Sequence, residues 1–292
     1  MQTACSRTES EKSKTPSQGN LAAPQSPAPS AGIIGGQRAS PKSFFAGKIL
    51  YLATGVQITK DGNSSTGMSW TGVCTASAIA PDLILTAAHC VKDHKISQLA
   101  VTMAANADSS VLDLSQWYFV KSLQVHPNYM GLANDLFHDV AVLRLTQKLP
   151  DSKVLKLAAA NQIKAPLSLV AVGYGTTSDS SDQEKIKAAT SGLHYVLKTV
   201  EKYDPSDKVF SIDQRDHKGF CSGDSGGPGL LYDTHLKDFF IVGVVSFTGM
   251  TDVERNRIDP QQQFSLCIGN GNYTNLNNQD IRSWIDQQLT QH

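Results

Sequence analysis

Three short segments, far apart in the chain, carry the side chains that an activated-serine reaction needs. His89 lies in the segment Leu-Thr-Ala-Ala-His-Cys, Asp139 directly precedes the run Val-Ala-Val-Leu, and Ser225 lies in Gly-Asp-Ser-Gly-Gly-Pro. A serine hydroxyl is a weak nucleophile until a neighbouring base accepts its proton, and a carboxylate can orient that base. The order His, Asp, Ser therefore predicts acyl transfer through a covalent intermediate on Ser225.

These motifs resemble those of the trypsin/chymotrypsin family of serine proteases, and the resemblance extends from Ile33 to about Ile285. A lone Gly-Asp-Ser-Gly would be a weak signal, whereas three motifs in this order, roughly 50 and 85 residues apart, are specific. The resemblance implies an all-β fold of two antiparallel six-stranded Greek-key barrels with a C-terminal helix. It also implies a serine endopeptidase with protein or peptide substrates and protein inhibitors as partners, without a cofactor, and we expect a monomer.

Asp139 has a competitor for the role of the orienting carboxylate. Asp135 lies in Asn-Asp-Leu, which also resembles the Asn-Asp-hydrophobic triplet of the family. Asp139 is favoured because the predicted strand 140–145 follows it directly, whereas Asp135 runs into Phe137 and His138.

The resemblance also assigns an oxyanion hole and an activation site. The backbone N–H groups of Gly223 and Ser225 are expected to form the oxyanion hole. The segment Ile-Ile-Gly-Gly that starts at Ile33 resembles the N-terminus that is freed when family precursors are cut, and its amine would then pair with buried Asp224. We therefore expect the printed chain to be an inactive precursor. Gly32 stands where many members have Arg or Lys, so self-activation and cleavage by a protease that prefers small residues both stay open.

The residues that correspond to the substrate pocket supply no carboxylate for a basic side chain. In this family the pocket base lies six residues before the nucleophile, where trypsin-like members have Asp and this chain has Gly219, followed by Phe220. The walls are expected to comprise Ser246, Phe247, Thr248 and Gly271. We therefore predict a neutral, apolar P1 residue rather than a basic one.

Further roles for the pocket residues follow from the same resemblance. Phe220 is expected to fill part of the pocket and Thr248 to narrow it, and the Ser246 hydroxyl is expected to hold Asp139. Residues 246–248 should also pair with the substrate backbone as an added strand. Asp216 and Asp252 would reach the pocket only if the neighbouring loops fold differently.

Five cysteines leave one without a predicted partner. The resemblance pairs Cys74 with Cys90 and Cys221 with Cys267, which favours an oxidising, extracytoplasmic location and a secreted protein. Cys5 follows Thr3 and Ala4 and faintly resembles a bacterial lipoprotein acylation site, although a plain leader cysteine is the favoured interpretation.

Composition excludes several other classes. The 292-residue chain has 26 Lys+Arg and 26 Asp+Glu, so no excess of charge suggests nucleic acid as a partner. The histidines form no metal-ligand pattern, so no metal is expected. Residues 1–32 are rich in Pro, Ala and Ser and predict a disordered leader without the apolar core of a signal peptide. This small-residue leader and the two expected disulfides favour a bacterial source.

The elements that must position these side chains are mostly short strands. Apolar runs separated by Gly, Asn and Ser clusters predict strands at 48–54, 72–80, 83–87, 118–125, 140–145, 167–172, 193–200 and 239–245. Residues 278–291 predict a helix from apolar side chains at i, i+3, i+4 and i+8. We expect a protease domain at 33–292, with one barrel at about 33–155, a second at 156–277, and the catalytic residues in the cleft between them.

Two other functional classes fit the sequence less well. A catalytically inactive binding protein on the same fold would be expected to lack a triad member, whereas all three are present. An α/β-hydrolase esterase has its triad in the order Ser, Asp, His and a Gly-x-Ser-x-Gly elbow, and Gly-Asp-Ser-Gly around Ser225 lacks that spacing.

Overall fold

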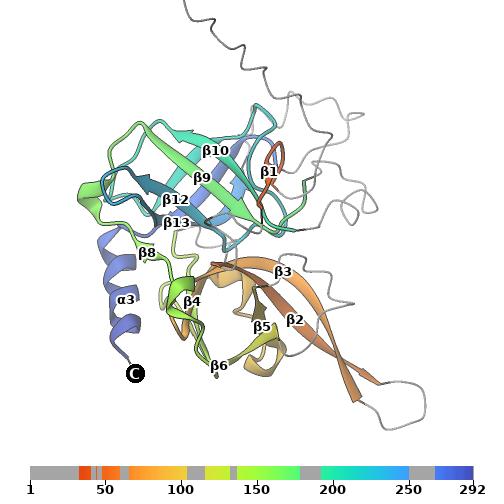
Figure 1. The fold of residues 1–292 in the computed structure, drawn as a ribbon. Coiled ribbons are helices and arrows are strands. Elements are labelled where there is room, and N and C mark those ends of the chain that lie inside the picture. Colours follow the sequence, from red (N-terminus) through yellow and green to blue (C-terminus); the bar gives the residue numbers. More distant parts are fainter. Residues whose placement is uncertain are drawn as a thin grey trace, which may run out of the picture.

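The computed structural model describes residues 33–40, 44, 48–59, 66–103, 116–131, 137–177, 192–249 and 267–291. The expected leader, Cys5, Asp135 and Asp252 lie outside these residues. The described chain forms two β structures stacked on one another, with a single α-helix beside the lower one (Figure 1).

The lower structure is a closed antiparallel barrel with the strand order β2-β3-β4-β7-β6-β5. Its strands are β2 (Ile49–Thr59), β3 (Thr66–Ala80), β4 (Leu83–Thr86), β5 (Leu99–Thr102), β6 (Trp117–Val125) and β7 (Ala141–Leu145). The central strands β4 and β7 are almost entirely buried. This burial explains why their sequences are nearly continuous apolar runs rather than alternating ones.

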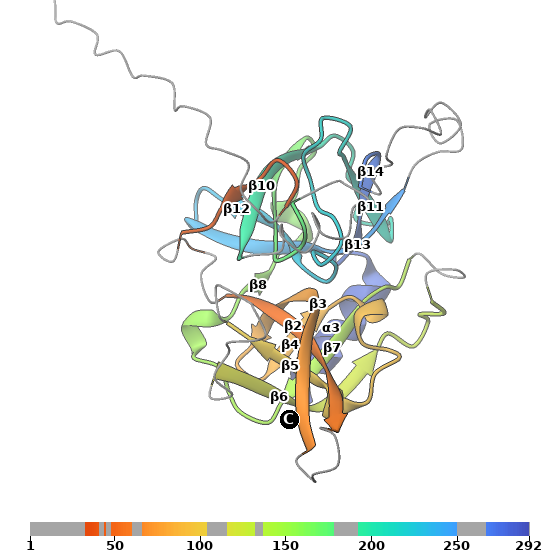
Figure 2. The same cartoon turned by 90° about the vertical axis from the view of Figure 1, so that its right-hand side faces the viewer.

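The upper structure is, within the described residues, an eight-stranded sheet with the order β1-β10-β9-β12-β13-β14-β11, and β8 pairs with β13 beside this path. Its strands are β1 (Gln37–Arg38), β8 (Lys156–Leu157), β9 (Leu167–Gly173), β10 (His194–Val200), β11 (Val209–Asp213), β12 (Pro228–Asp233), β13 (Asp238–Gly249) and β14 (Asn270–Asn275). Figure 2 shows the sheet curling over the barrel. The predicted all-β fold is confirmed, with the second body a curled half-barrel rather than a closed one.

Helical segments are few and short among the described residues. The 3-10 turns are η1 (Ala88–Cys90), η2 (Ile96–Gln98), η4 (Asp151–Lys153) and η5 (Ala160–Gln162). The α-helix α3 (Gln279–Thr290) begins after Asn278, whose side chain accepts a hydrogen bond from the Asp280 N–H at 3.2 Å. This bond satisfies one of the free N–H groups of the first turn. The predicted C-terminal helix is therefore confirmed, with slightly narrower bounds.

One apolar cluster joins the barrel, the sheet and the helix. It contains Leu85 and Leu143 from the barrel, Val244 from the sheet and Ile285 from α3, all at most 1% exposed. A second cluster lies within the sheet alone. Because the first cluster crosses the boundary between the two β structures, apolar burial holds them together and fixes the loops that meet there.

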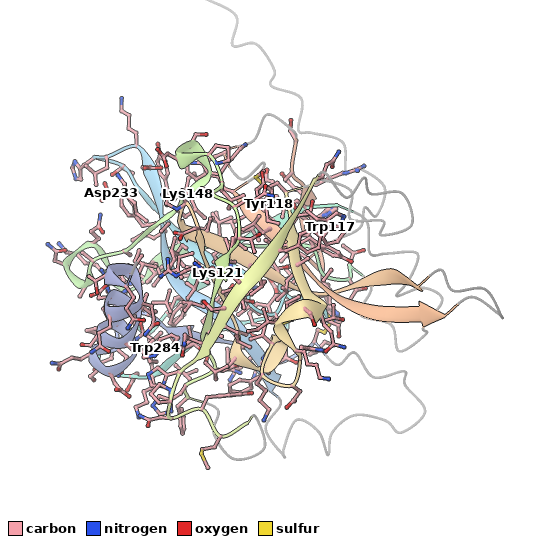
Figure 3. The ribbon with its side chains drawn as sticks, turned by 90° about the horizontal axis from the view of Figure 1, so that it is seen from below. Trp117, Tyr118, Lys121, Lys148, Asp233 and Trp284 are labelled. Carbon is pink, nitrogen blue, oxygen red and sulfur yellow. A yellow bond between two sulfur atoms is a disulfide. The ribbon has the colours of Figure 1, made fainter. Side chains whose placement is uncertain are left out.

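Aromatic stacking holds the segment before Asp139 against the helix. The rings of His126 and His138 stack at 4.9 Å, and His126 also meets the edge of Trp284 at 5.1 Å. Trp284 is labelled beside α3 in Figure 3. His138 Nε2 lies 3.3 Å from the Asp280 carboxylate in the first turn of α3. These contacts fix the backbone immediately before Asp139.

Candidate active site

The pairing of β4 with β7 brings His89 and Asp139 together. The strands are antiparallel with Thr86 opposite Ala141, so the end of β4 lies beside the start of β7. His89 lies in the 3-10 turn directly after β4, and Asp139 lies two residues before β7. Antiparallel pairing alone therefore places these two side chains at the same edge of the barrel.

Asp139 is fully buried, and both of its carboxylate oxygens accept hydrogen bonds. Oδ1 accepts from the His89 backbone N–H at 2.8 Å, and Oδ2 lies 2.7 Å from His89 Nδ1. The Ser246 hydroxyl donates to the same Oδ2 at 2.5 Å. Since a carboxylate is only an acceptor, this network assigns the proton of the neutral imidazole to Nδ1 and leaves Nε2 as an acceptor.

Residues 221–227, called the Ser225 loop from here on, lie directly before β12 of the upper sheet. Gly226 N–H donates to the Val245 carbonyl and Val245 N–H donates to the Gly227 carbonyl, both at 2.8 Å, just before β12 begins at Pro228. Ser246 follows Val245 directly. The same strand pair therefore carries the serine loop and the hydroxyl that reaches Asp139 in the other half of the site.

Thr75 of the barrel holds the Ser225 loop against the barrel edge. Its N–H donates to the Ser225 carbonyl at 2.8 Å, and its hydroxyl donates to the Gly223 carbonyl at 2.9 Å. The Thr86 hydroxyl in turn donates to the Thr75 carbonyl at 3.0 Å. These bonds bring Ser225 to the end of β4, where His89 lies. The sequence interpretation missed Thr75, although its position next to Cys74 was a signal.

A close approach at Gly226 explains why this position carries no side chain. A Cβ at Gly226 would collide with the Thr86 hydroxyl and lie 2.9 Å from the Ala87 nitrogen. The loop is therefore in backbone contact with the segment that leads into His89. A larger residue here would push Ser225 away from His89.

Two disulfides frame the site. Cys74–Cys90 joins β3 to the turn that carries His89, and Cys221–Cys267 joins the serine loop to the segment before β14. Both pairings are those that the family resemblance implied. Because Cys74 precedes Thr75 and Cys90 follows His89, the Cys74–Cys90 disulfide holds the Thr75 and His89 segments close together.

The described residues contain no hydrogen bond between Ser225 and His89. His89 Nε2 lies 3.6 Å from Cys90 Sγ, and within the described residues no hydrogen bond joins it to the Ser225 hydroxyl. The His89 side chain is 22% exposed, so it borders the open side of the site. Bonds of this kind are often long without substrate and shorten when substrate binds.

The backbone N–H groups around the serine are available to an incoming oxygen. Gly223 has a φ of +94°, a left-handed conformation that favours glycine. Among the described residues, neither the Gly223 N–H nor the Ser225 N–H has a hydrogen-bond acceptor, whereas the Asp224, Gly226 and Gly227 N–H groups do. Two N–H groups without internal partners beside a serine hydroxyl form an arrangement that can stabilise a developing oxyanion.

Asp224 is a fully buried carboxyl with two backbone donors. It accepts from the Gly175 N–H at 2.8 Å and the Cys221 N–H at 2.9 Å. Burial raises the pKa of Asp224 to about 7, against the lowering effect of these hydrogen bonds. Within the described residues no cation pairs with it, so the negative charge is costly there at neutral pH.

Ile33 is buried, and the residue after it contacts the segment that leads to Asp224. It is 0% exposed and has a φ of +51°, a strained value for a β-branched residue. The next residue, Ile34, forms an antiparallel bridge with Gly219, and the Gly219 N–H donates to the Ile34 carbonyl at 3.0 Å. The segment after Gly32 is therefore attached to the base of the expected substrate pocket.

The expected pocket contains a side chain that the sequence interpretation missed. Gln214 is 1% exposed, and its amide nitrogen donates to the Phe220 carbonyl at 3.0 Å and to the Cys267 carbonyl at 2.7 Å. Its amide oxygen accepts from the Phe220 N–H at 3.0 Å. No local sequence signal marks Gln214, because loop folding alone brings it beside Gly219 and Gly271.

The walls of the expected pocket are adjacent strands. Thr248 of β13 lies opposite Gly271 of β14, and the Asn272 side-chain amide donates to the Phe247 carbonyl at 3.2 Å. Asp216 does not line them, because its carboxylate accepts from Lys198 Nζ at 2.7 Å and its side chain is 54% exposed. Asp216 is therefore not part of the expected pocket in this structure.

One group of potential metal ligands lies in the described residues. His89, Cys74 and Cys90 offer ligand atoms within 4.8 Å of one another. The two sulfurs are joined to each other in a disulfide, however, and zinc and similar ions bind thiolates. This group therefore does not suit a metal ion.

Comparisons with known proteins show which family the sequence resembles. Residues 33–264 match the family model described as Trypsin. The chain is 24% identical over 204 residues to Phenoloxidase-activating factor 3 of Holotrichia diomphalia, covering 62% of this chain and 58% of that protein. It is 27% identical over 245 residues to Melanization protease 1 of Drosophila melanogaster, covering 74% and 58%. With Vitamin K-dependent protein C of Oryctolagus cuniculus it shares 28% over 197 residues, covering 60% and 40%.

The chain belongs to the trypsin family, since the match covers most of its length. It spans between 30% and 58% of the length of four of the curated relatives that it matches. The relatives named above come from insects and a mammal, so they lend no support to the expected bacterial source or to a lipid anchor at Cys5. None of the described helices is long and apolar enough to cross a membrane.

Proposed function

We propose that this chain is a secreted serine endopeptidase that hydrolyses peptide bonds through an acyl-enzyme on Ser225. The observation that carries the proposal is the hydrogen-bond network from Ser246 through Asp139 to His89, with the Ser225 loop attached to the same barrel edge by Thr75. Membership of the trypsin family and relatives whose names include proteases support the same activity.

In this mechanism His89 Nε2 accepts the Ser225 proton while Ser225 Oγ attacks the carbonyl carbon of the scissile bond. Asp139 keeps the other imidazole proton on Nδ1 and stabilises the imidazolium that forms. The Gly223 and Ser225 N–H groups receive the oxyanion, and one such donor typically contributes about 3 kcal/mol to the transition state. His89 then protonates the leaving amine, and water releases the acyl group by the reverse sequence of proton transfers.

Activation is proposed to follow cleavage before Ile33, with residues 1–32 as the removed leader and 33–292 as the protease unit. Buried Asp224, whose pKa is raised by burial, would gain the Ile33 α-ammonium as a partner. Cutting the bond before Ile33 would also abolish the strained φ of that residue, because the torsion ceases to exist. The family match that starts at residue 33 supports this boundary.

The proposed substrates have a neutral P1 residue. Gly219 supplies no carboxylate, and the nearest described acid on its loop, Asp216, is engaged by Lys198. An Arg or Lys side chain would therefore lose its hydration without gaining a charged partner.

The test is labelling with a fluorophosphonate probe before and after cleavage that leaves Ile33 as the N-terminus. We expect Ser225 to be labelled only after cleavage, because the proposed ion pair then completes the site. Ser225→Ala should abolish labelling, whereas the exposed β9 variant Ser168→Ala should label like the parent protein.

Two other outcomes would change the proposal. Labelling before cleavage would keep the endopeptidase and remove the need for the Ile33–Asp224 pair. No labelling in either state, with Ile33 verified as the N-terminus, would favour the alternative of a catalytically inactive binding protein on the trypsin fold.

A further inference from the structure

We infer that Gln214 and Phe220 fill the primary specificity pocket and restrict P1 to glycine or alanine, including Gly32 of the chain's own precursor. This inference rests on the proposed endopeptidase function. It narrows the substrate class from neutral residues to the smallest ones, and it assigns the restriction to two side chains.

The space in question is defined by two glycines that face it from different segments. Gly219 precedes Ser225 by six residues, and Gly271 lies opposite Thr248 on the neighbouring strand. A Cβ at either glycine would collide with the Gln214 side-chain amide. The side-chain directions of both glycines therefore converge on the place where the Gln214 amide lies.

Phe220 occupies the same region from its other side. A Cβ at Gly271 would also lie 2.8 Å from Phe220 Cε1, and the Phe220 ring packs edge-on against Tyr273 with centroids 5.1 Å apart. Gln214, Phe220 and Tyr273 are each at most 1% exposed. Among the described residues, the Gln214 and Phe220 side chains therefore occupy the region into which a side chain at position 219 or 271 would project.

The filling side chains are firmly held rather than displaceable. Both N–H groups of the Gln214 amide have carbonyl partners, and its oxygen has a backbone donor. Moving this amide aside would break three buried hydrogen bonds, each a substantial loss. A bulky P1 residue would have to displace Gln214 or Phe220 on binding, whereas glycine or alanine would not.

The bond before Ile33 fits this restriction. The residues that precede it are Ser30, Ala31 and Gly32, so P1 there is glycine. In an active copy, Ser225 Oγ would attack the Gly32 carbonyl carbon of a second chain, and the Gly32–Ile33 C–N bond would break. His89 would deliver the proton to the Ile33 amine, and water would then release the leader as a free carboxylate.

The experiment uses the full-length chain with residues 28–32 replaced by the recognition sequence of an activating protease that leaves Ile33 as the new N-terminus. Fluorophosphonate titration first counts active sites, so a protein without labelling contradicts the proposed function and not the pocket. Peptides that differ only at P1 then give kcat/KM for Gly, Ala, Leu, Phe and Arg. We expect Gly or Ala to exceed Leu, Phe and Arg by about 100-fold or more, because small differences in fit discriminate by about 10- to 200-fold.

Two variants open the pocket and two matched variants do not. Phe220→Ala and Gln214→Ala should raise the Leu/Ala and Phe/Ala ratios of kcat/KM by about 10-fold or more. Phe240→Ala removes a buried ring of the same sheet, and Gln288→Ala removes a buried glutamine of α3. Both controls should leave these ratios unchanged.

The precursor Ser225→Ala, which carries its natural leader, is the final substrate. Active enzyme should cut it between Gly32 and Ile33, and Gly32→Phe in the same precursor should block this cleavage. Parent enzyme that prefers Leu or Phe at P1 would overturn the inference even if the pocket variants fail to fold. Intact precursor in the presence of titrated enzyme would overturn the self-activation part.

Discussion

The two halves of the candidate site are stabilised in different ways. In the barrel half, His89 and Asp139 lie at the ends of paired strands, and each Asp139 oxygen has a hydrogen-bond donor. In the sheet half, Asp224 is buried without a cation among the described residues, and Ile33 has a left-handed backbone. The barrel half is thus complete in the uncut chain, whereas the sheet half contains an uncompensated buried acid.

This difference indicates where control of the proposed activity would act. A network whose polar groups all have partners gains little from a further charge, whereas a buried carboxyl gains much from one. Cleavage before Ile33 should therefore give the Asp224 carboxylate a charged partner and leave the His89–Asp139 pair unchanged. The following predictions test this contrast, from the largest expected effect to the smallest.

The largest effect is expected in the barrel half. Asp139→Asn in the cleaved enzyme should lower kcat by about 10⁴-fold, because the amide no longer favours the imidazole tautomer with the proton on Nδ1. Steady-state kinetics on an Ala-P1 peptide measures this loss. Asp82→Asn, which removes a carboxylate bound to Arg144 at 3.0 Å, is the matched control. Normal turnover in Asp139→Asn together with an inactive Asp135→Asn would transfer the role to Asp135.

The next effect is a pH dependence of the uncut chain that arises in the sheet half. The pKa of Asp224 is about 7 in the folded chain, above its ordinary 3.8, so the folded state holds this proton more tightly than the unfolded state. The stability that this carboxyl contributes is therefore present below about pH 4 and is lost as the pH rises toward 7, by roughly 4 kcal/mol.

Asp224→Asn in the uncut chain should remove this loss. Urea unfolding at pH 4.5 and pH 7.5 measures it as the difference between the parent protein and the variant. A variant with the same pH dependence as the parent would show that folding does not raise the pKa of Asp224. In the cleaved enzyme the same substitution should lower probe labelling, since the proposed Ile33 pair is lost.

The two disulfides offer a comparison of the halves at the level of stability. Replacing Cys221 and Cys267 by alanine opens a 46-residue loop, and replacing Cys74 and Cys90 opens a 16-residue loop. The chain-entropy relation predicts losses of about 4 and about 3 kcal/mol in unfolding free energy. Denaturant unfolding checks both values, and Cys5→Ala should change nothing. A larger loss from the barrel disulfide would show that its contacts beside Thr75 outweigh loop length.

The smallest effect concerns Ser246, whose hydroxyl reaches from the sheet to the Asp139 carboxylate. Ser246→Ala removes a hydrogen bond to the charged Asp139 and should lower kcat by about 10- to 100-fold, since such bonds contribute about 1.5–3 kcal/mol. The loss should be smaller than for Asp139→Asn, because both His89 contacts remain. Ser211→Ala, which loses a 2.7 Å bond to Asn272, is the matched control. Equal losses in Ser246→Ala and Ser211→Ala would indicate a general packing effect.

Local sequence patterns predicted most of the framework. Buried strands such as β4 and β7 are continuous apolar runs, and α3 has apolar side chains on one face, so both kinds of element follow from short windows. Strands β1, β5, β8, β11, β12 and β14 match none of the predicted ranges. Asn270–Asn275 is rich in polar residues, and Val209–Asp213 is only five residues long. The pairing of β11 with β14 and of β14 with β13 is a long-range contact that no short window contains.

The sequence by itself determined the family, the candidate triad and the absence of a carboxylate at Gly219, because these depend on residue types at recognisable motifs. Only the tertiary structure decided that Gln214 lies beside Phe220 in the pocket and that Thr75 holds the Ser225 loop. Gln214 contacts Cys267, 53 residues away, and Thr75 lies 148 residues from its partner Gly223. Such contacts depend on how the sheet packs against the barrel, and local composition carries no record of that packing.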